Sequence, residues 1–176
     1  MQRSDPPHPI VNLDAIELMP RPAAYAAPGE AAQRFDGSTG DVASRIGARK
    51  LGYNITAVPA GKRAFPLHNH HVNEELFFIL EGNGEVRIGD RRHAVRKGDF
   101  IACPPGGPDT AHQIINTGDT PLKYLAVSTM QYPEICDYPD SGKFLVAEGP
   151  RGSDGKAQGF RFVGRPGSMV DYWEGE

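Results

Sequence analysis

The residue types best suited to chemistry in this sequence gather between Gly61 and Gly82, where histidines and glutamates lie close together. His68 and His70 are separated by one residue, and in a β-strand residues two apart project from the same face. Both imidazoles can therefore reach one ion while Asn69 points away. This spacing predicts a metal site built on a strand.

A carboxylate following the two histidines would complete such a site, but the alternation of side chains leaves its identity open. Glu75 has the opposite parity, so it faces the same ion only if a turn at residues 71–73 resets the phase. Asn73 suits such a turn because asparagine readily bonds to nearby backbone. Glu74 is the alternative, and spacing alone does not choose between the two glutamates.

A further histidine, His112, lies much later in the chain, in the β-patterned run HQIIN that follows a stretch rich in proline and glycine. A ligand from so distant a segment would tie metal binding to folding. The remaining histidines are expected to have no ligand role: His8, His71 and His93. The two cysteines are not spaced like zinc-ribbon ligands and are expected to be reduced, buried thiols: Cys103 and Cys136.

The elements that must position these side chains are short strands. Glycine and proline make up 37 of the 176 residues, and both weaken helix interiors while suiting turns. Between about residues 51 and 128, apolar and β-branched runs alternate with turn signals, and Asn83-Gly84 and Gly89-Asp90 predict tight hairpins. The predicted strands are Leu51–Val58, Phe65–His70, Glu75–Leu80, Glu85–Ile88, His93–Arg96, Phe100–Cys103, His112–Asn116 and Leu122–Ser128. This pattern predicts an all-β fold, a small antiparallel barrel or sandwich.

The two ends of the chain differ from this central part. Six of the sixteen prolines fall within residues 1–28, which show no sustained apolar period. We therefore expect an extended N-terminal arm over residues 1–44, a barrel over residues 45–130 and an irregular C-terminal extension over residues 131–176.

Composition excludes some functions. The net charge is −3 and the isoelectric point is about 6.1, so the chain lacks the basic stripe that nucleic-acid binding requires. No run of eighteen apolar residues is present, which argues against membrane insertion, and the N-terminal residues do not resemble an export signal. We expect a cytoplasmic protein whose partners are small molecules.

These residues resemble the two signature motifs of the cupin superfamily. The first motif is matched by Gly61, His68, His70, Glu75 and Gly82, and its six-residue interval from glutamate to glycine selects Glu75 over Glu74. The second motif is matched by Gly98, Pro104, Gly106, His112 and Asn116. One interval in each motif is longer than usual, by one residue before His68 and by three before His112, and lengthening a loop in this way costs little free energy.

The resemblance covers roughly residues 45–130 and is closest to small bacterial single-domain cupins of unassigned activity. It implies a double-stranded β-helix, or jelly-roll-like barrel, with one metal ion inside near one mouth. The implied ligands are His68, His70, Glu75 and His112. Three imidazoles and one carboxylate suit a divalent transition metal such as Fe, Mn, Zn or Ni. The resemblance also implies a homodimer formed through N-terminal strands.

Membership in this superfamily leaves the activity open, because one fold serves many functions. A dioxygenase-like enzyme would need an apolar pocket, for which Phe65, Phe77, Ile79, Phe100 and Ile114 are candidates. A Lewis-acid isomerase or lyase would need a proton acceptor, for which Tyr53, Tyr124 and Glu74 are candidates. A non-catalytic sensor of a metal or small ligand is the alternative to an enzyme, and a metal-free cluster of hydrogen-bonded histidines is a third possibility.

Asn116 could orient a ligand or hold the turn before Gly118.

Overall fold

Antiparallel strands are the main regular elements of the computed structural model, which describes residues 8–23, 26–150 and 158–176. The strands are β1 (Met19–Pro20), β2 (Ser38–Asp41), β3 (Leu51–Val58), β4 (Asn69–His70), β5 (Glu75–Glu81), β6 (Asn83–Ile88), β7 (Arg91–Arg96), β8 (Phe100–Cys103), β9 (His112–Ile115), β10 (Leu122–Thr129), β11 (Glu134–Tyr138), β12 (Lys143–Ala147) and β13 (Arg161–Gly164). The helices described are short 3-10 turns: η1 (Leu13–Ala15), η3 (Gly29–Gln33), η4 (Pro139–Ser141) and η5 (Pro166–Ser168). The predicted all-β fold is confirmed. None of the described helices has the length and hydropathy needed to cross a bilayer.

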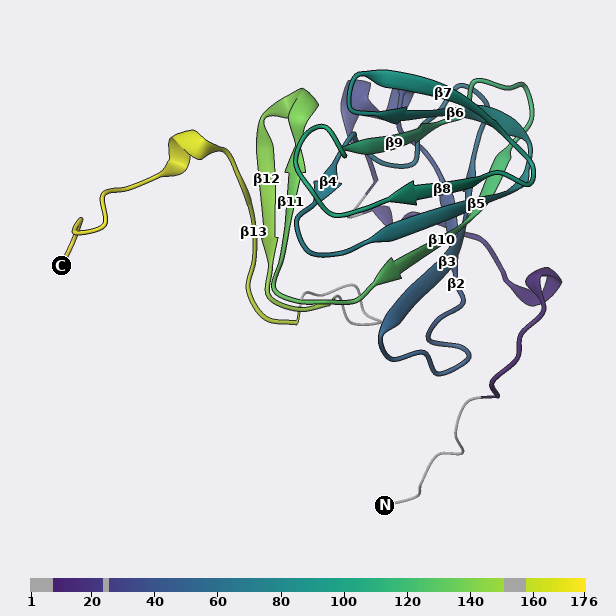
Figure 1. Cartoon of the computed structure of the whole chain (residues 1–176), viewed down its shortest axis with the longest axis horizontal. Helices are drawn as coiled ribbons and strands as arrows, with labels where there is room; N and C mark the ends of the chain where they lie inside the picture. The colour runs from purple at the N-terminus through teal and green to yellow at the C-terminus, as the bar shows by residue number, and fades with distance from the viewer. Residues whose placement is uncertain (1–7, 24–25, 151–157) are drawn as a thin grey trace, which may run out of the picture.

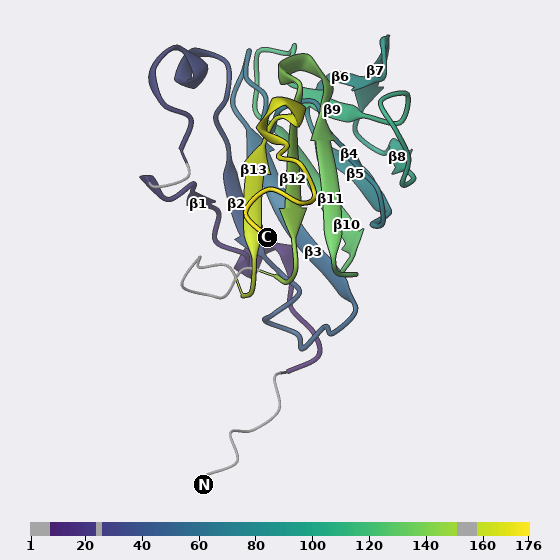
Figure 2. The ribbon, with the colours of Figure 1, turned by 90° about the vertical axis from the view of Figure 1, so that its left-hand side faces the viewer.

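Three sheets enclose the interior. The largest has the order β1-β2-β3-β10-β5-β8, the second β13-β12-β11-β4 and the third β7-β6-β9. Figure 1 shows the three-stranded sheet above the six-stranded one, with the four-stranded sheet beside them, and this last sheet faces the viewer in Figure 2. The short strand β4, which carries His70, pairs with β11 and so belongs to the four-stranded sheet.

The apolar core lies between these sheets. In β5 the side chains alternate, so that Phe77 and Ile79 are buried while their neighbours are only partly covered. Phe77 packs edge-on against Tyr124 of β10, with ring centroids 5.5 Å apart. Each fully buried apolar side chain of this size contributes roughly 1.5–3 kcal/mol to folding. The core also reaches the histidines, since the ring centroid of Phe77 lies 5.5 Å from that of His112.

The chain leaves one sheet and enters another at Gly82. This glycine has φ +81°, and a Cβ there would lie 2.6 Å from the carbonyl oxygen of Pro121. The predicted Asn83-Gly84 hairpin turn is wrong, because both residues lie inside β6 and the positive φ belongs to the preceding glycine. The Gly89-Asp90 hairpin is confirmed as the turn between β6 and β7.

The C-terminal extension is more regular than the sequence predicts. Its runs EICDY and KFLVA form β11 and β12, which pair along their whole lengths. Both runs are short and alternate between buried and more exposed positions, so their signal is weak until a partner strand is present. Beyond β13 the chain is exposed, and Trp173 is 73% accessible.

Candidate metal centre

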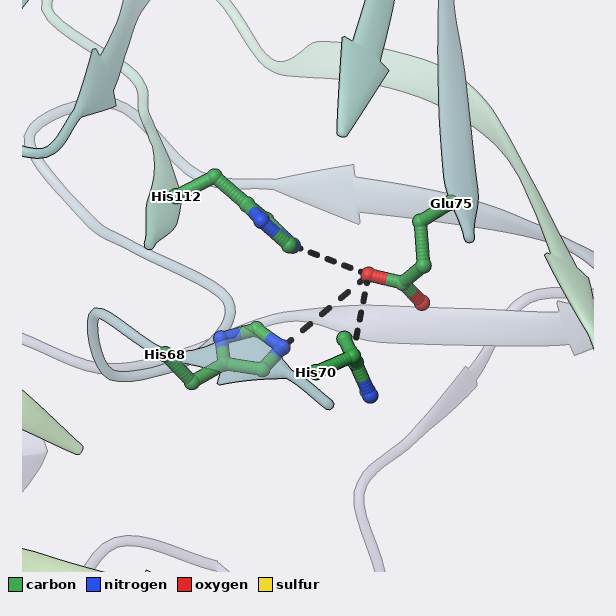
Figure 3. Close-up of side chains that lie close together, drawn as sticks. All are labelled: His68, His70, Glu75 and His112. Atoms are coloured by element: carbon green, nitrogen blue, oxygen red, sulfur yellow. Dashed lines mark hydrogen bonds and ion pairs between the residues drawn. The ribbon is translucent and has the colours of Figure 1, made fainter. Parts of the chain in front are cut away.

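Three imidazoles converge on one carboxylate oxygen inside the barrel (Figure 3). Oε2 of Glu75 lies 2.9 Å from Nε2 of His112, 3.4 Å from Nε2 of His70 and 4.0 Å from Nε2 of His68. One ligand atom of each of these four residues lies within 4.8 Å of all the others. The structure thus brings together the four residues that the sequence motifs single out.

Backbone pairing from four strand segments builds this cluster. His68 and His112 form an isolated antiparallel bridge, in which each backbone N–H donates to the other residue's carbonyl at 3.2 and 2.8 Å. His70 is held by the pairing of β4 with β11, and Glu75 begins β5 between β8 and β10. The interruption between β4 and β5 resets the alternation, which is why Glu75 joins the histidines despite its parity.

Glu74 and His71 lie outside the cluster. Glu74 is exposed, and its backbone N–H donates to the hydroxyl of Thr129. His71 pairs instead with Asp137, whose carboxylate oxygen lies 2.6 Å from its Nε2. Asn73 holds the intervening turn, since its side chain bonds to Thr129, Gln131 and Glu134.

The other ring nitrogen of each histidine is also engaged. Nδ1 of His68 lies 2.9 Å from the carbonyl oxygen of Pro66, and Nδ1 of His112 lies 3.4 Å from that of Thr110. Nδ1 of His70 lies 3.3 Å from Sγ of Cys136 and 3.6 Å from Oε2 of Glu134. Contacts at Nδ1 orient an imidazole so that its Nε2 faces the opposite way. All three rings are therefore aimed at the same point.

Glu134 and Cys136 contact the site although the sequence analysis assigned them no role there. Glu134 is only 4% exposed and accepts backbone N–H bonds from His71, Val72, Asn73 and Ile135. The one signal in the sequence is the alternating run EICDY between two prolines, which places Glu134 and Cys136 on one face of a strand. Because this run lies in the extension expected to be irregular, nothing in the sequence related it to the histidines.

The pKa values of the two neighbouring histidines, His68 and His70, are shifted in opposite directions. Burial lowers the pKa of His68 to about 4. Burial also opposes protonation of His70, but its contacts with Cys136, Glu134 and Glu75 raise its pKa to about 12. Burial opposes ionisation of Glu75, yet bonds from His112 and His70 hold its pKa well below the usual range. Without a metal, His70 therefore carries a proton between two carboxylates at neutral pH.

A cavity of about 180 Å³ adjoins the cluster. Its apolar wall includes Phe65, Phe77 and Ile114, all three of which the sequence analysis proposed as pocket residues. Its polar groups besides the cluster are Asn54, Thr56, Gln113 and Tyr124, and no lysine or arginine is among the described residues that line it. The cavity therefore offers an uncharged environment next to the charged cluster.

Other residues expected around the site lie elsewhere. The side-chain amide of Asn116 donates to the carbonyls of Val58 and Thr120, and its Oδ1 accepts from the N–H of Gly118. Asn116 thus holds the turn, the second of the two roles considered for it. Ile79 is buried in the core, and Phe100 is 71% exposed and packs on Phe78 outside the barrel. Strand alternation explains Phe100, which lies on the exposed face of β8. Ile79 shares the buried face of β5 with Phe77 but lies two residues further along the strand and does not line the cavity.

The cluster fits the divalent transition metal that the donor set suggests. Nε2 of His70 is buried and makes no hydrogen bond within the described part of the chain, although it points at the other ligand atoms. An unsatisfied buried nitrogen is costly unless another group binds it. Three imidazole nitrogens and one carboxylate are the ligand types of Fe, Mn, Zn and Ni sites. The chain therefore has a His/Glu cluster able to hold such an ion.

Comparisons with known proteins agree with this architecture. The family model Cupin_2, described as a cupin domain, matches residues 54–128. The uncharacterized protein MJ1618 of Methanocaldococcus jannaschii is 41% identical over 75 residues, which are 43% of this chain and 57% of that protein. The chain thus spans little more than half the length of this relative.

Solved structures share the fold over more of the chain. A sugar phosphate isomerase from a cupin superfamily of Silicibacter pomeroyi superposes with a TM-score of 0.71 and 23% identity, covering 91% of this chain and 94% of that one. A putative sugar phosphate isomerase from Acidithiobacillus ferrooxidans gives 0.66 and 22%, covering 77% and 80%. At this identity the likeness establishes the fold alone. Residues 54–128 are thus similar to a cupin domain, and the chain shares the fold of a solved cupin-superfamily protein.

Proposed function

We propose that His68, His70, Glu75 and His112 hold one divalent transition metal and that the chain is a metal-dependent enzyme acting on a small organic substrate. The observation that carries this proposal is the convergence of three Nε2 atoms on Oε2 of Glu75. Contacts at the three Nδ1 atoms hold the rings in place before any ion binds. Such preorganisation lowers the cost of binding the metal.

The bound ion would supply Lewis acidity and, if it is iron, the redox chemistry of oxygenases. The residues of the chain supply the remaining functions. The cavity next to the cluster holds the substrate, Phe77 and Ile114 keep water away from its body, and Asn54 and Thr56 offer polar partners for its oxygen atoms. The chain therefore positions a substrate beside the metal.

The cavity indicates the class of substrate. Its volume of about 180 Å³ admits a molecule the size of a catechol or a small diketone. Because its described lining has no lysine or arginine, a strongly anionic group on the side away from the cluster would lose its hydration without gaining an ion pair. We infer a compact, largely apolar substrate that presents one or two oxygen atoms to the metal.

The lining also favours oxygenase-type chemistry over proton transfer. Of the three candidate proton acceptors, Tyr124 alone lines the cavity, and burial raises its pKa, so it stays protonated. A Lewis-acid isomerase or lyase needs a base close to the substrate. Apart from the proposed metal ligands, the described lining offers no such base, and we therefore place the oxygenase first.

A sugar phosphate isomerase is the second candidate. The likeness of this chain to two solved structures favours it. These are the proteins from Silicibacter pomeroyi and Acidithiobacillus ferrooxidans, which are named as a sugar phosphate isomerase and a putative one. The cavity weighs against it, since a phosphate group would find no lysine or arginine among the described lining residues. We therefore place it after the oxygenase.

Oxygen consumption tests the proposal directly. Metal-free protein is loaded with Fe(II) under argon and mixed with oxygenated buffer and a panel of catechols, thiols and diketones. We expect substrate-dependent oxygen uptake that Glu75→Gln abolishes and Glu74→Gln leaves unchanged, because Glu74 is exposed outside the cluster. Isomerisation of a sugar phosphate without oxygen uptake would establish the second candidate. Ligand-induced thermal stabilisation without any turnover would establish a sensor and overturn both enzyme proposals.

Homodimerisation through N-terminal strands and a cytoplasmic location also stay proposals. The first is checked by light scattering of the purified chain, with a mass of twice 19.1 kDa as the expected result.

A further inference from the structure

A second cavity, of about 500 Å³, lies between the N-terminal arm and the barrel. Four basic residues line it: Arg21, Arg34, Arg63 and Lys143. They come from the arm, from the segment before β4 and from the start of β12. In Figures 1 and 2 the arm segment η3 and the turn between β11 and β12 lie at the same end of the molecule. Only the folded chain brings these charges together.

Backbone contacts hold the arm against the barrel at this point. The N–H of Arg63 donates to the carbonyl of Arg34 at 3.0 Å, and the N–H of Asp36 donates to the carbonyl of Arg63 at 3.1 Å. Arg21 donates from Nη2 to the carbonyl of Ala64 at 2.7 Å, and its guanidinium lies 4.8 Å from the ring centroid of Phe65. Hydrogen bonds therefore hold three of the basic residues in place at this cavity. Arg34 and Arg63 are held through their backbone groups, and Arg21 is held through its side chain.

The charge of this cavity is not balanced by its own lining. Asp140 is the one carboxylate among the described lining residues, and Arg87 binds it through two contacts of 3.0 and 2.9 Å. None of the four basic residues forms an ion pair with any residue that the structure describes. The whole chain has a net charge of −3, so four of its 19 lysines and arginines at one cavity create a local positive potential against the overall charge.

The rest of the lining is largely apolar. Phe35, Pro28, Pro66 and Leu67 contribute to the walls. A pocket that joins a few charged groups to an apolar wall suits a small organic molecule better than a bare ion. Guanidinium groups match the oxygens of a phosphate or carboxylate through paired N–H donors.

We propose that this cavity binds a small organic dianion, specifically a phosphate monoester, with its phosphate on the basic residues and its organic part on the apolar wall. The site lies outside the cavity that adjoins the metal cluster, although Gln113 lines both. The proposal does not rest on the metal site or on any activity there. It assigns to the arm the role of completing a binding site.

Calorimetric titration with phenyl phosphate tests this site. We expect saturable binding of one molecule per chain, weaker binding of inorganic phosphate, which lacks the organic part, and no binding of phenol, which lacks the charge. The double variant Arg34→Gln with Lys143→Gln should weaken phenyl phosphate binding at least tenfold. Arg92→Gln is the matched control, because Arg92 is exposed on β7 and pairs with Glu85 away from this cavity. Circular dichroism verifies that each variant is folded.

A variant of the metal cluster separates this proposal from the previous one. His68→Ala with His70→Ala removes two of the proposed metal ligands but should bind phenyl phosphate as the wild type does. Absence of saturable binding by the wild type at millimolar concentration would overturn the anion site, as would unchanged binding by the Arg34/Lys143 double variant. Loss of binding in the histidine variant alone would place the anion at the metal cluster and would also overturn it.

Discussion

Glu134 lies directly behind His70, with its Oε2 3.6 Å from Nδ1 of the imidazole whose Nε2 faces Glu75. His70 is thus held between a carboxylate from β11 and a carboxylate from β5. The first of these carboxylates is buried and fixed by backbone N–H donors, so it cannot move away without leaving those donors unpaired. β11 therefore orients the ring that the motif on β4 supplies.

Changing Glu134 to Gln should weaken metal binding without removing any proposed ligand. Loss of the charge behind His70 leaves its ring less firmly oriented, and changes of this kind typically cost 10–100-fold in metal affinity. Competition with a chromophoric chelator measures the affinity. Glu85→Gln, whose carboxylate pairs with Arg92 outside the cluster, serves as the control and should bind metal normally. Equal affinities for Glu134→Gln and wild type would show that the Glu134 carboxylate does not orient His70 for metal binding.

The purified protein should contain close to one transition metal ion per chain by elemental analysis. His68→Ala with His70→Ala should remove it, because two of four donors are lost. Glu75→Gln should reduce the metal content far more than Glu74→Gln, whose side chain lies outside the cluster. Full metal content in the double histidine variant would contradict the assignment of the ligands.

Metal binding at pH 7 should release about one proton per ion. His70 is protonated in the metal-free cluster because its pKa is raised to about 12, whereas His68, with a pKa near 4, is already neutral. A metal needs the neutral imidazole, so it must displace the proton of His70, and affinity should fall about tenfold for each pH unit of acidification near neutrality. Calorimetry in buffers of different ionisation enthalpy counts the protons. A count near zero would show that His70 binds metal without prior protonation or does not bind it.

The metal-free protein should lose stability as the pH rises from 6.5 to 8.5. The pKa of His70 is higher in the folded state, about 12, than in the unfolded chain, about 6.5, so its contribution is fully present below pH 6.5 and decreases above it. The slope from this residue is at most about 1.4 kcal/mol per pH unit. Urea unfolding at several pH values measures it, and His70→Gln should remove the slope. A pH-independent wild type would contradict the raised pKa.

Asn116→Ala should destabilise the fold while leaving metal affinity intact. The amide of Asn116 makes three hydrogen bonds within the turn and to β3, all in a fully buried position. Leaving such partners unsatisfied costs about 2–3 kcal/mol. Urea unfolding gives the change in stability, and the chelator competition described above gives the affinity. A large loss of metal affinity in a folded variant would restore a role at the site for Asn116.

The sequence by itself determined the local parts of this protein. The two-residue spacing of His68 and His70 and the need for a turn before Glu75 follow from the alternation of a strand, and the structure has that alternation and that turn. Most central strands could likewise be predicted from the sequence, since each is marked by its own apolar residues and turn signals. Such features depend on residues within a few positions of one another.

Only the tertiary structure decided which distant segments meet. It placed Glu134 and Cys136 behind His70, gave the turn role to Asn116, and moved the predicted turn from Asn83-Gly84 to Gly82. It also gathered Arg21, Arg34, Arg63 and Lys143 around one cavity. The physical reason is that strand pairing joins residues dozens of positions apart through backbone groups common to all sequences, so the side chains brought together have no local signal of their meeting.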